Sequence, residues 1–144
     1  MLALPAMLLV QGMLFSQAGA ADASPGAFSP GGQTYRAMPA SDCLAGKVGE
    51  KITLSFTLDP PQLPQGVFLS VNMKMRNAPV TSGKNSKPDV LTGFPETRMV
   101  FHFPGIYRYT VIVSMMAKSS CGGVTADTIF KGAVDIQVSP PDPR

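Results

Sequence analysis

Hydrophobic and polar residues alternate along much of the chain between residues 51 and 138. Apolar side chains at every second position predict β-strands with one buried face. The series Ile52, Leu54, Phe56, Leu58 and the series Tyr107, Tyr109, Val111, Val113, Met115 show this pattern most clearly. Five strands are predicted, and they span residues 51–58, 67–75, 97–103, 107–115 and 130–138. No stretch has a convincing helical period, so the pattern indicates an all-β protein.

Glycine and proline separate the predicted strands. Asp59-Pro60-Pro61 ends the first strand, and Pro104-Gly105 stands between the third and the fourth. Short strands divided by such turns favour an antiparallel β-sandwich. Two longer irregular segments, residues 77–95 and 117–126, are expected at the surface, where functional contacts often lie. The first of them could contain short edge strands near Val80 and near Val90-Leu91.

The two ends of the chain differ in composition from the middle. Residues 1–15 are mostly apolar and are followed by Ser16-Gln17-Ala18-Gly19-Ala20, which predicts a signal peptide over residues 1–20. The alternative is an anchoring helix, but the apolar run is shorter than the roughly 20 residues that span a membrane. We therefore expect no stable membrane span once the signal is removed. The usual basic residues are missing from this segment, because the first Lys or Arg is Arg36.

The remaining chain divides into one domain with two flanking segments. Residues 21–42 are rich in Ala, Gly, Ser and Pro, which predicts a flexible leader. Residues 43–138 form the predicted sandwich, and residues 139–144, with three prolines, form a flexible tail. With 144 residues, the chain has room for one such domain.

Two cysteines, Cys43 and Cys121, lie in the predicted domain. An even number of cysteines in an exported chain predicts a disulfide, which would close almost the whole domain into a loop. The predicted location is the periplasm or the extracellular space. A metal site would need further Cys or His residues nearby, but His102 is the single histidine. A catalytic Cys–His pair stays open as a minor alternative.

Two short segments resemble those of immunoglobulin-like domains. Residues 49–56 are similar to their B strand, with Phe56 where antibody domains carry a cysteine. Residues 101–113, with Phe103-Pro104-Gly105 before Tyr107 and Tyr109, resemble the start of their F strand in bacterial extracellular immunoglobulin-like and PKD-like domains. The resemblance implies an immunoglobulin-like β-sandwich, in which Tyr107 forms a tyrosine corner and the aromatic residues replace the inter-sheet disulfide.

Charge and motif content point away from several functions. The net charge is only +3, and no dense Lys/Arg run is interleaved with aromatic residues, so nucleic acid is not an expected partner. The carboxylates show no spacing typical of paired acid and base groups, and no serine lies in a nucleophile elbow. The sequence therefore predicts a protein that is not an enzyme and has no cofactor.

The remaining function class is recognition. A β-sandwich offers edge strands and end loops to other proteins, so we expect an exported binding or accessory module with a protein partner. Lys84 and Lys87 in one irregular segment and Lys118 in the other are the candidate contact residues. The alternative is a periplasmic copper-binding protein, because thioether and imidazole groups suit copper; His102 and Met116 are its candidate ligands.

Overall fold

The structure, a computed structural model, describes residues 32–80, 87–118 and 121–143. It contains eight strands and, in these residues, no α-helix. The predicted signal peptide, residues 1–20, lies outside the described part of the chain. In the part that is described, no helix is long and apolar enough to cross a membrane.

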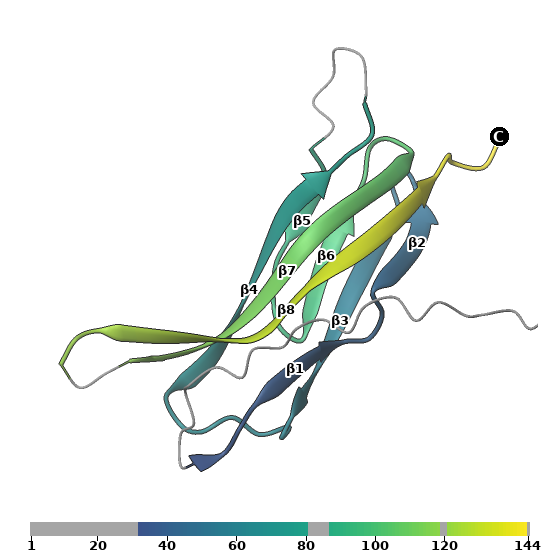
Figure 1. Ribbon diagram of the computed structural model, residues 1–144. Helices are drawn as coiled ribbons and strands as arrows, with labels where there is room; N and C mark the ends of the chain where they lie inside the picture. Colours follow the sequence, from purple (N-terminus) through teal and green to yellow (C-terminus); the bar gives the residue numbers. More distant parts are fainter. Residues whose placement is uncertain (1–31, 81–86, 119–120, 144) are drawn as a thin grey trace, which may run out of the picture.

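The strands form two four-stranded sheets (Figure 1). The first sheet has the order β1-β3-β6-β5, and the second has the order β2-β8-β7-β4. The strand bounds are β1 Arg36–Pro39, β2 Cys43–Lys47, β3 Lys51–Asp59, β4 Val67–Asn77, β5 Asp89–Leu91, β6 Glu96–Val100, β7 Gly105–Lys118 and β8 Val124–Ser139. The predicted all-β sandwich is confirmed.

The chain changes sheets early. β1 pairs with β3 in the first sheet, and β2 then pairs with β8 in the second. One sheet contains β3, β6 and β5, and the other contains β4, β7 and β8. Immunoglobulin-like sandwiches divide their strands between two sheets in the same way. The prediction of a wholly antiparallel sandwich needs one correction, because β2 runs parallel to β8. Since β2 and β8 are far apart in sequence, no tight hairpin constrains their direction.

The core lies between the sheets and follows the predicted alternation. On β7 every second side chain from Tyr107 to Met115 is at most 3% exposed. On β3 the buried side chains are Ile52, Leu54 and Phe56. These two strands belong to opposite sheets, so their apolar faces meet across the sandwich and exclude water, which is the main favourable contribution to folding.

The segments around β1, β6 and β8 differ from the sequence prediction. β1 lies within residues 21–42, which were predicted as a flexible leader; there Tyr35 and Ala37 are buried, at 6% and 3% exposed. β8 begins at Val124, inside a segment predicted as irregular. β6 ends at Val100, yet the next residue, Phe101, is fully buried and packs against Tyr107 with ring centroids 4.5 Å apart.

The turn before β7 is fixed by Tyr107 and Gly105. The hydroxyl of Tyr107 donates a 2.9 Å hydrogen bond to the carbonyl oxygen of Phe103, which is the contact that a tyrosine corner makes. Gly105 has a φ of 141°, a conformation open almost only to glycine. A Cβ atom at this position would also overlap the ring of Pro79. The chain can therefore enter β7 only with glycine here.

We expect Gly105→Ala to lower the free energy of unfolding by about 3 kcal/mol, because backbone strain adds to the overlap with Pro79. Gly49→Ala is the matched control: Gly49 also has a positive φ, 80°, but no atom would lie within 4 Å of the new Cβ. This control should cost about 1 kcal/mol. Urea unfolding of both variants measures the difference, and equal losses would show that Pro79 gives way freely.

Candidate functional site

The most prominent surface feature is an arm formed by the end of the β7–β8 hairpin (Figure 1). We define the arm as residues 114–118 of β7 and 124–128 of β8. Residues 67–70 of β4 pair with residues 114–117 of the arm, from Ser70 opposite Ser114 to Val67 opposite Ala117. A bulge at Val113/Ser114 leaves Ile129 without a direct partner across the hairpin. Bulges bend a strand and increase its twist, and the hairpin leaves the body of the sandwich near this point.

One face of the arm carries a row of apolar side chains from three strands. Phe68 lies opposite Met116, and Met116 lies opposite Ala126. The adjacent residue, Met115, is fully buried on the core side, so this row points away from the core. Phe68 is 45% exposed, and Val124 near the tip is 55% exposed.

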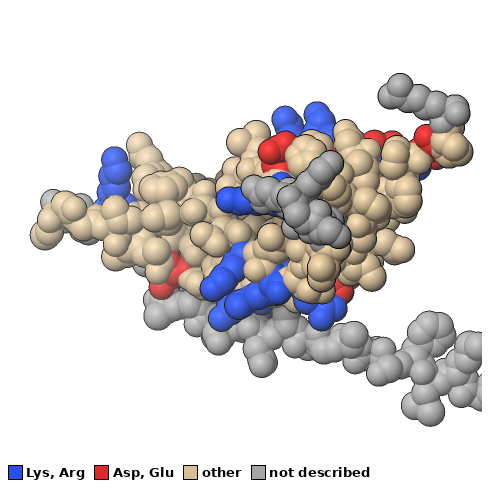
Figure 2. Space-filling view, turned by 90° about the horizontal axis from the view of Figure 1, so that it is seen from above, with Lys and Arg blue, Asp and Glu red and all other residues tan. Residues whose placement is uncertain are grey.

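The arm carries little charge. Its described residues include one basic and one acidic side chain, Lys118 and Asp127. Figure 2 shows the projecting part as mostly uncharged, whereas Lys and Arg side chains gather over the body of the sandwich. An uncharged apolar row next to a single cation is a surface that a protein partner can cover with little desolvation of charge.

A second feature is a groove between β4 and β5, which are edge strands of the two sheets. The groove has a volume of about 260 Å³. Its lining residues come from β4, from β5 and the residues flanking it, and from β7: Met73, Met75, Lys87, Pro88, Val90, Thr92 and Tyr109. Because β4 and β5 do not pair with each other, the sandwich is open along this side.

Tyr109 contributes the polar group of special interest. Its side chain belongs to the core and is only 3% exposed, yet Tyr109 Oη has no hydrogen-bond partner among the described residues. Burial of the phenol, helped by the nearby Tyr107, raises the pKa of Tyr109 to about 12. The hydroxyl therefore stays protonated and can donate a hydrogen bond at neutral pH.

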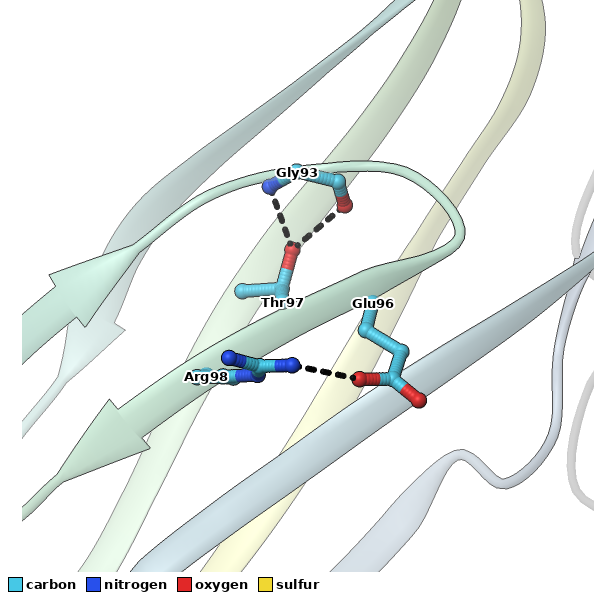
Figure 3. Close-up of polar contacts among 4 residues, drawn as sticks. All are labelled: Gly93, Glu96, Thr97 and Arg98. Carbon is cyan, nitrogen blue, oxygen red and sulfur yellow. Dashed lines mark hydrogen bonds and ion pairs between the residues drawn. The ribbon is translucent and has the colours of Figure 1, made fainter.

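The β5–β6 turn carries Thr92, which lines the groove, and Figure 3 shows the polar contacts within this turn and β6. Thr97 is fully buried, and its hydroxyl donates to the carbonyl oxygen of Gly93 at 3.1 Å and accepts from the amide of Gly93 at 3.2 Å. This pair of contacts ties the turn to β6 and so fixes Thr92, which precedes Gly93. Arg98 and Glu96 form an ion pair of 3.2 Å on the other side of the strand.

The predicted contact lysines are not brought together. Lys87 lines the groove, and Lys118 ends β7 at the arm. Lys84 lies outside the described residues. On the second sheet Arg108 makes two 2.7 Å hydrogen bonds to Asp135, and this contact lowers the pKa of the Asp135 carboxyl. The exposed Arg108–Asp135 pair stabilises the pairing of β7 with β8.

The predicted disulfide is not formed in the structure. Cys43 and Cys121 are both free and exposed. Cys43 lies opposite Asp135 on β8, whereas Cys121 follows Lys118 at the tip of the arm, where Lys118 pairs with Val124. From Asp135 to Val124 the distance along the strand is roughly 35 Å, while a disulfide needs Cα atoms within about 7 Å. The sequence prediction missed this because it treated the segment around Cys121 as an irregular loop.

The predicted copper ligands, His102 and Met116, also lie far apart. His102 precedes β7 and contacts Asp89, with 3.0 Å between Nε2 and Oδ2. Met116 lies near the opposite end of β7, eleven residues after Gly105, or roughly 35 Å along the strand. These two residues therefore do not form one site. The described residues also contain no group of three or more His, Cys, Asp or Glu side chains that could hold a metal ion.

The other predicted residues lie in the core. Phe56 is 4% exposed and stacks on Phe94 with ring centroids 6.0 Å apart. Tyr107 and Tyr109 fill the space between the sheets, as the aromatic residues were expected to do. The sequence prediction did not find Phe68, and it placed the Tyr109 ring correctly without revealing its unpartnered hydroxyl. Period-two alternation assigns a side chain to a face, but it does not show where a sheet ends.

The fold and these surfaces define a β-sandwich with an apolar arm and a side groove. No known protein family, curated protein or solved structure matches the chain.

The thiols provide a direct check of the arm geometry. We expect the reduced full chain to react with two equivalents of a maleimide without denaturant, because Cys43 and Cys121 are both exposed. Mild oxidation of dilute protein should then give disulfide-linked dimers. Mass spectrometry under non-reducing conditions measures both outcomes, and a monomer that has lost two hydrogens would contradict the separation of the two cysteines.

Tyr109 makes a specific contribution to stability at alkaline pH. Its pKa in the folded protein, about 12, lies above the value near 10 of an unfolded chain. The folded state therefore holds its proton more tightly, and this contribution is present below pH 10 and disappears as the pH rises to about 12. We expect Tyr109→Phe to make the free energy of unfolding less steeply pH-dependent in this range. Urea unfolding between pH 9 and 12 measures this, and an unchanged slope would contradict the burial of the hydroxyl.

Proposed function

We propose that the protein is an exported, non-enzymatic binding module that recognises a protein partner through the arm. The observation that carries the proposal is the row formed by Phe68, Met116 and Ala126, which lies side by side on three paired strands and points away from the core. An exposed apolar row on a rigid, hydrogen-bonded element is a surface that binding can desolvate at low conformational cost.

The charge of the arm indicates the chemistry of the partner. Lys118 lies directly opposite Val124 near the tip, and Val124 is 55% exposed. A partner with an apolar contact surface and one acidic group at its border would cover Phe68 and Met116 and pair with Lys118. Such a border charge contributes mainly to the association rate and to orientation. Of the three lysines predicted to contact a partner, Lys118 is the one that lies on the arm.

Export remains part of the proposal on the strength of residues 1–20 alone. The apolar segment followed by Ala18-Gly19-Ala20 supports secretion into the periplasm or the medium. The resemblance to bacterial extracellular immunoglobulin-like and PKD-like domains agrees with export. It also agrees with a binding function, since such domains commonly mediate binding. Neither export nor binding through the arm requires a disulfide within the chain.

Replacement of the apolar row tests the proposal. We expect the double variant Phe68→Ser, Met116→Ser to abolish co-purification of the partner captured by the affinity-tagged full chain from its native source. Met38→Ser is the matched control, because Met38 is 49% exposed on β1 in the other sheet. Mass spectrometry of the captured proteins gives the readout. Thermal unfolding should change little for each variant, since these side chains are partly exposed.

Retention of the partner by the double variant, or equal loss with Met38→Ser, would overturn the assignment of the arm. Loss of binding together with a change from dimer to monomer in size-exclusion chromatography would identify a second copy of this chain as the partner. Lys118→Glu should slow association several-fold if an acidic group of the partner lies beside the tip.

A further inference from the structure

The groove between β4 and β5 is separate from the arm surface. Met73 and Tyr109 lie on the core side of the second sheet, where every second residue of β7 is buried. Phe68 and Met116 point to the opposite side of the same strands. An occupant of the groove and a partner on the arm would therefore touch different faces, and the inference that follows does not rest on the proposed function.

The lining of the groove defines what it can hold. Its walls are mostly apolar, with the thioethers of Met73 and Met75 on one side and Val90 with Pro88 on the other. Methionine side chains adapt their shape to an occupant and make favourable contacts with aromatic rings. A volume of about 260 Å³ lies just below the range of roughly 300 to 1,000 Å³ that is typical of drug-sized ligands. The groove is thus too small for a large cofactor.

The buried hydroxyl of Tyr109 is the second observation that points to an occupant. Tyr109 is 97% buried, lines the groove, and leaves Oη without a partner among the described residues. A buried hydroxyl without a hydrogen bond destabilises a protein by about 1 to 3 kcal/mol. An acceptor atom that reached Oη from the groove would remove this cost.

We propose that the groove binds a small, uncharged, largely apolar molecule with one hydrogen-bond acceptor, which accepts a hydrogen bond from Tyr109 Oη. Met73, Met75 and Val90 enclose its apolar part. A peptide main chain is a poorer occupant, because each of its residues brings an amide and a carbonyl group into a lining whose walls are mainly apolar. An isolated ketone or ether oxygen matches the unpartnered hydroxyl of Tyr109.

Acetophenone is a suitable probe, since it has one aromatic ring and one carbonyl acceptor. We expect its addition to the full chain, labelled with ¹³C at the methionine methyl groups, to shift the signals of Met73 and Met75. Met38 and Met116, which lie outside the groove, serve as internal controls. α-Methylstyrene has nearly the same shape but no acceptor, so it should bind several-fold more weakly.

Tyr109→Phe separates the hydrogen bond from the shape of the groove. This variant keeps the ring and should bind acetophenone about fivefold more weakly, while its affinity for α-methylstyrene stays the same or rises. Tyr107→Phe is the matched control, because Tyr107 does not line the groove and its hydroxyl donates to the carbonyl oxygen of Phe103. It should leave the affinity for acetophenone unchanged. Phe68→Ser, on β4 beside the arm, should also leave it unchanged whether or not the arm binds a protein.

Two results would overturn the proposal. One is the absence of any selective shift of Met73 or Met75 up to about 10 mM acetophenone, a concentration that detects the weak binding expected of a molecule this size. The other is equal affinity of the original chain and Tyr109→Phe for acetophenone, which would show that the hydroxyl does not hold the occupant. A partner that is lost from Phe68→Ser, Met116→Ser but kept by Tyr109→Phe would confirm that the two surfaces act separately.

Discussion

The alternating burial of β7 is the constraint on which the rest of the structure depends. From Tyr107 to Met115 every second side chain is almost completely buried, while hydrogen-bonded partners, β4 and β8, lie on both sides of the strand. Burial of each such side chain contributes about 1.5 to 3 kcal/mol. A shift of one residue in the register would move all five to the solvent face. The register of β7 therefore fixes the positions of its two neighbours.

The lengths of the strands explain why an arm exists. β7 and β8 have 14 and 16 residues, whereas β3 and β6 in the facing sheet have 9 and 5. The facing sheet therefore cannot cover the whole hairpin, and the part beyond it has less apolar surface to bury. Pairing with β4 as far as Ala117 keeps the arm in a three-stranded sheet up to the last residue but one of β7. The arm is thus an extension of the core strands and owes its position to them.

The sequence predicted the parts of the fold that depend on local alternation. Ile52, Leu54 and Phe56 are buried as expected, and a short edge strand occurs at Asp89–Leu91. Alternation alone did not predict β1 or the parallel strand β2, because strands of four and five residues carry too few alternating positions to stand out. The predicted disulfide between Cys43 and Cys121 is also not formed, since the number of cysteines carries no information on the distance between them.

The candidate surfaces show the same division between local pattern and long-range pairing. Alternation placed Tyr109 in the core, but the opening beside it depends on β4 and β5 being edge strands of different sheets. Likewise, Phe68, Met116 and Ala126 are scattered in the sequence and become neighbours only through the registers of β4, β7 and β8. Because a sheet presents alternate residues to opposite sides, one pair of strands can supply both a groove and a separate outer contact surface. Unequal strand lengths and unpaired edges therefore provide two candidate binding surfaces without any change in the core.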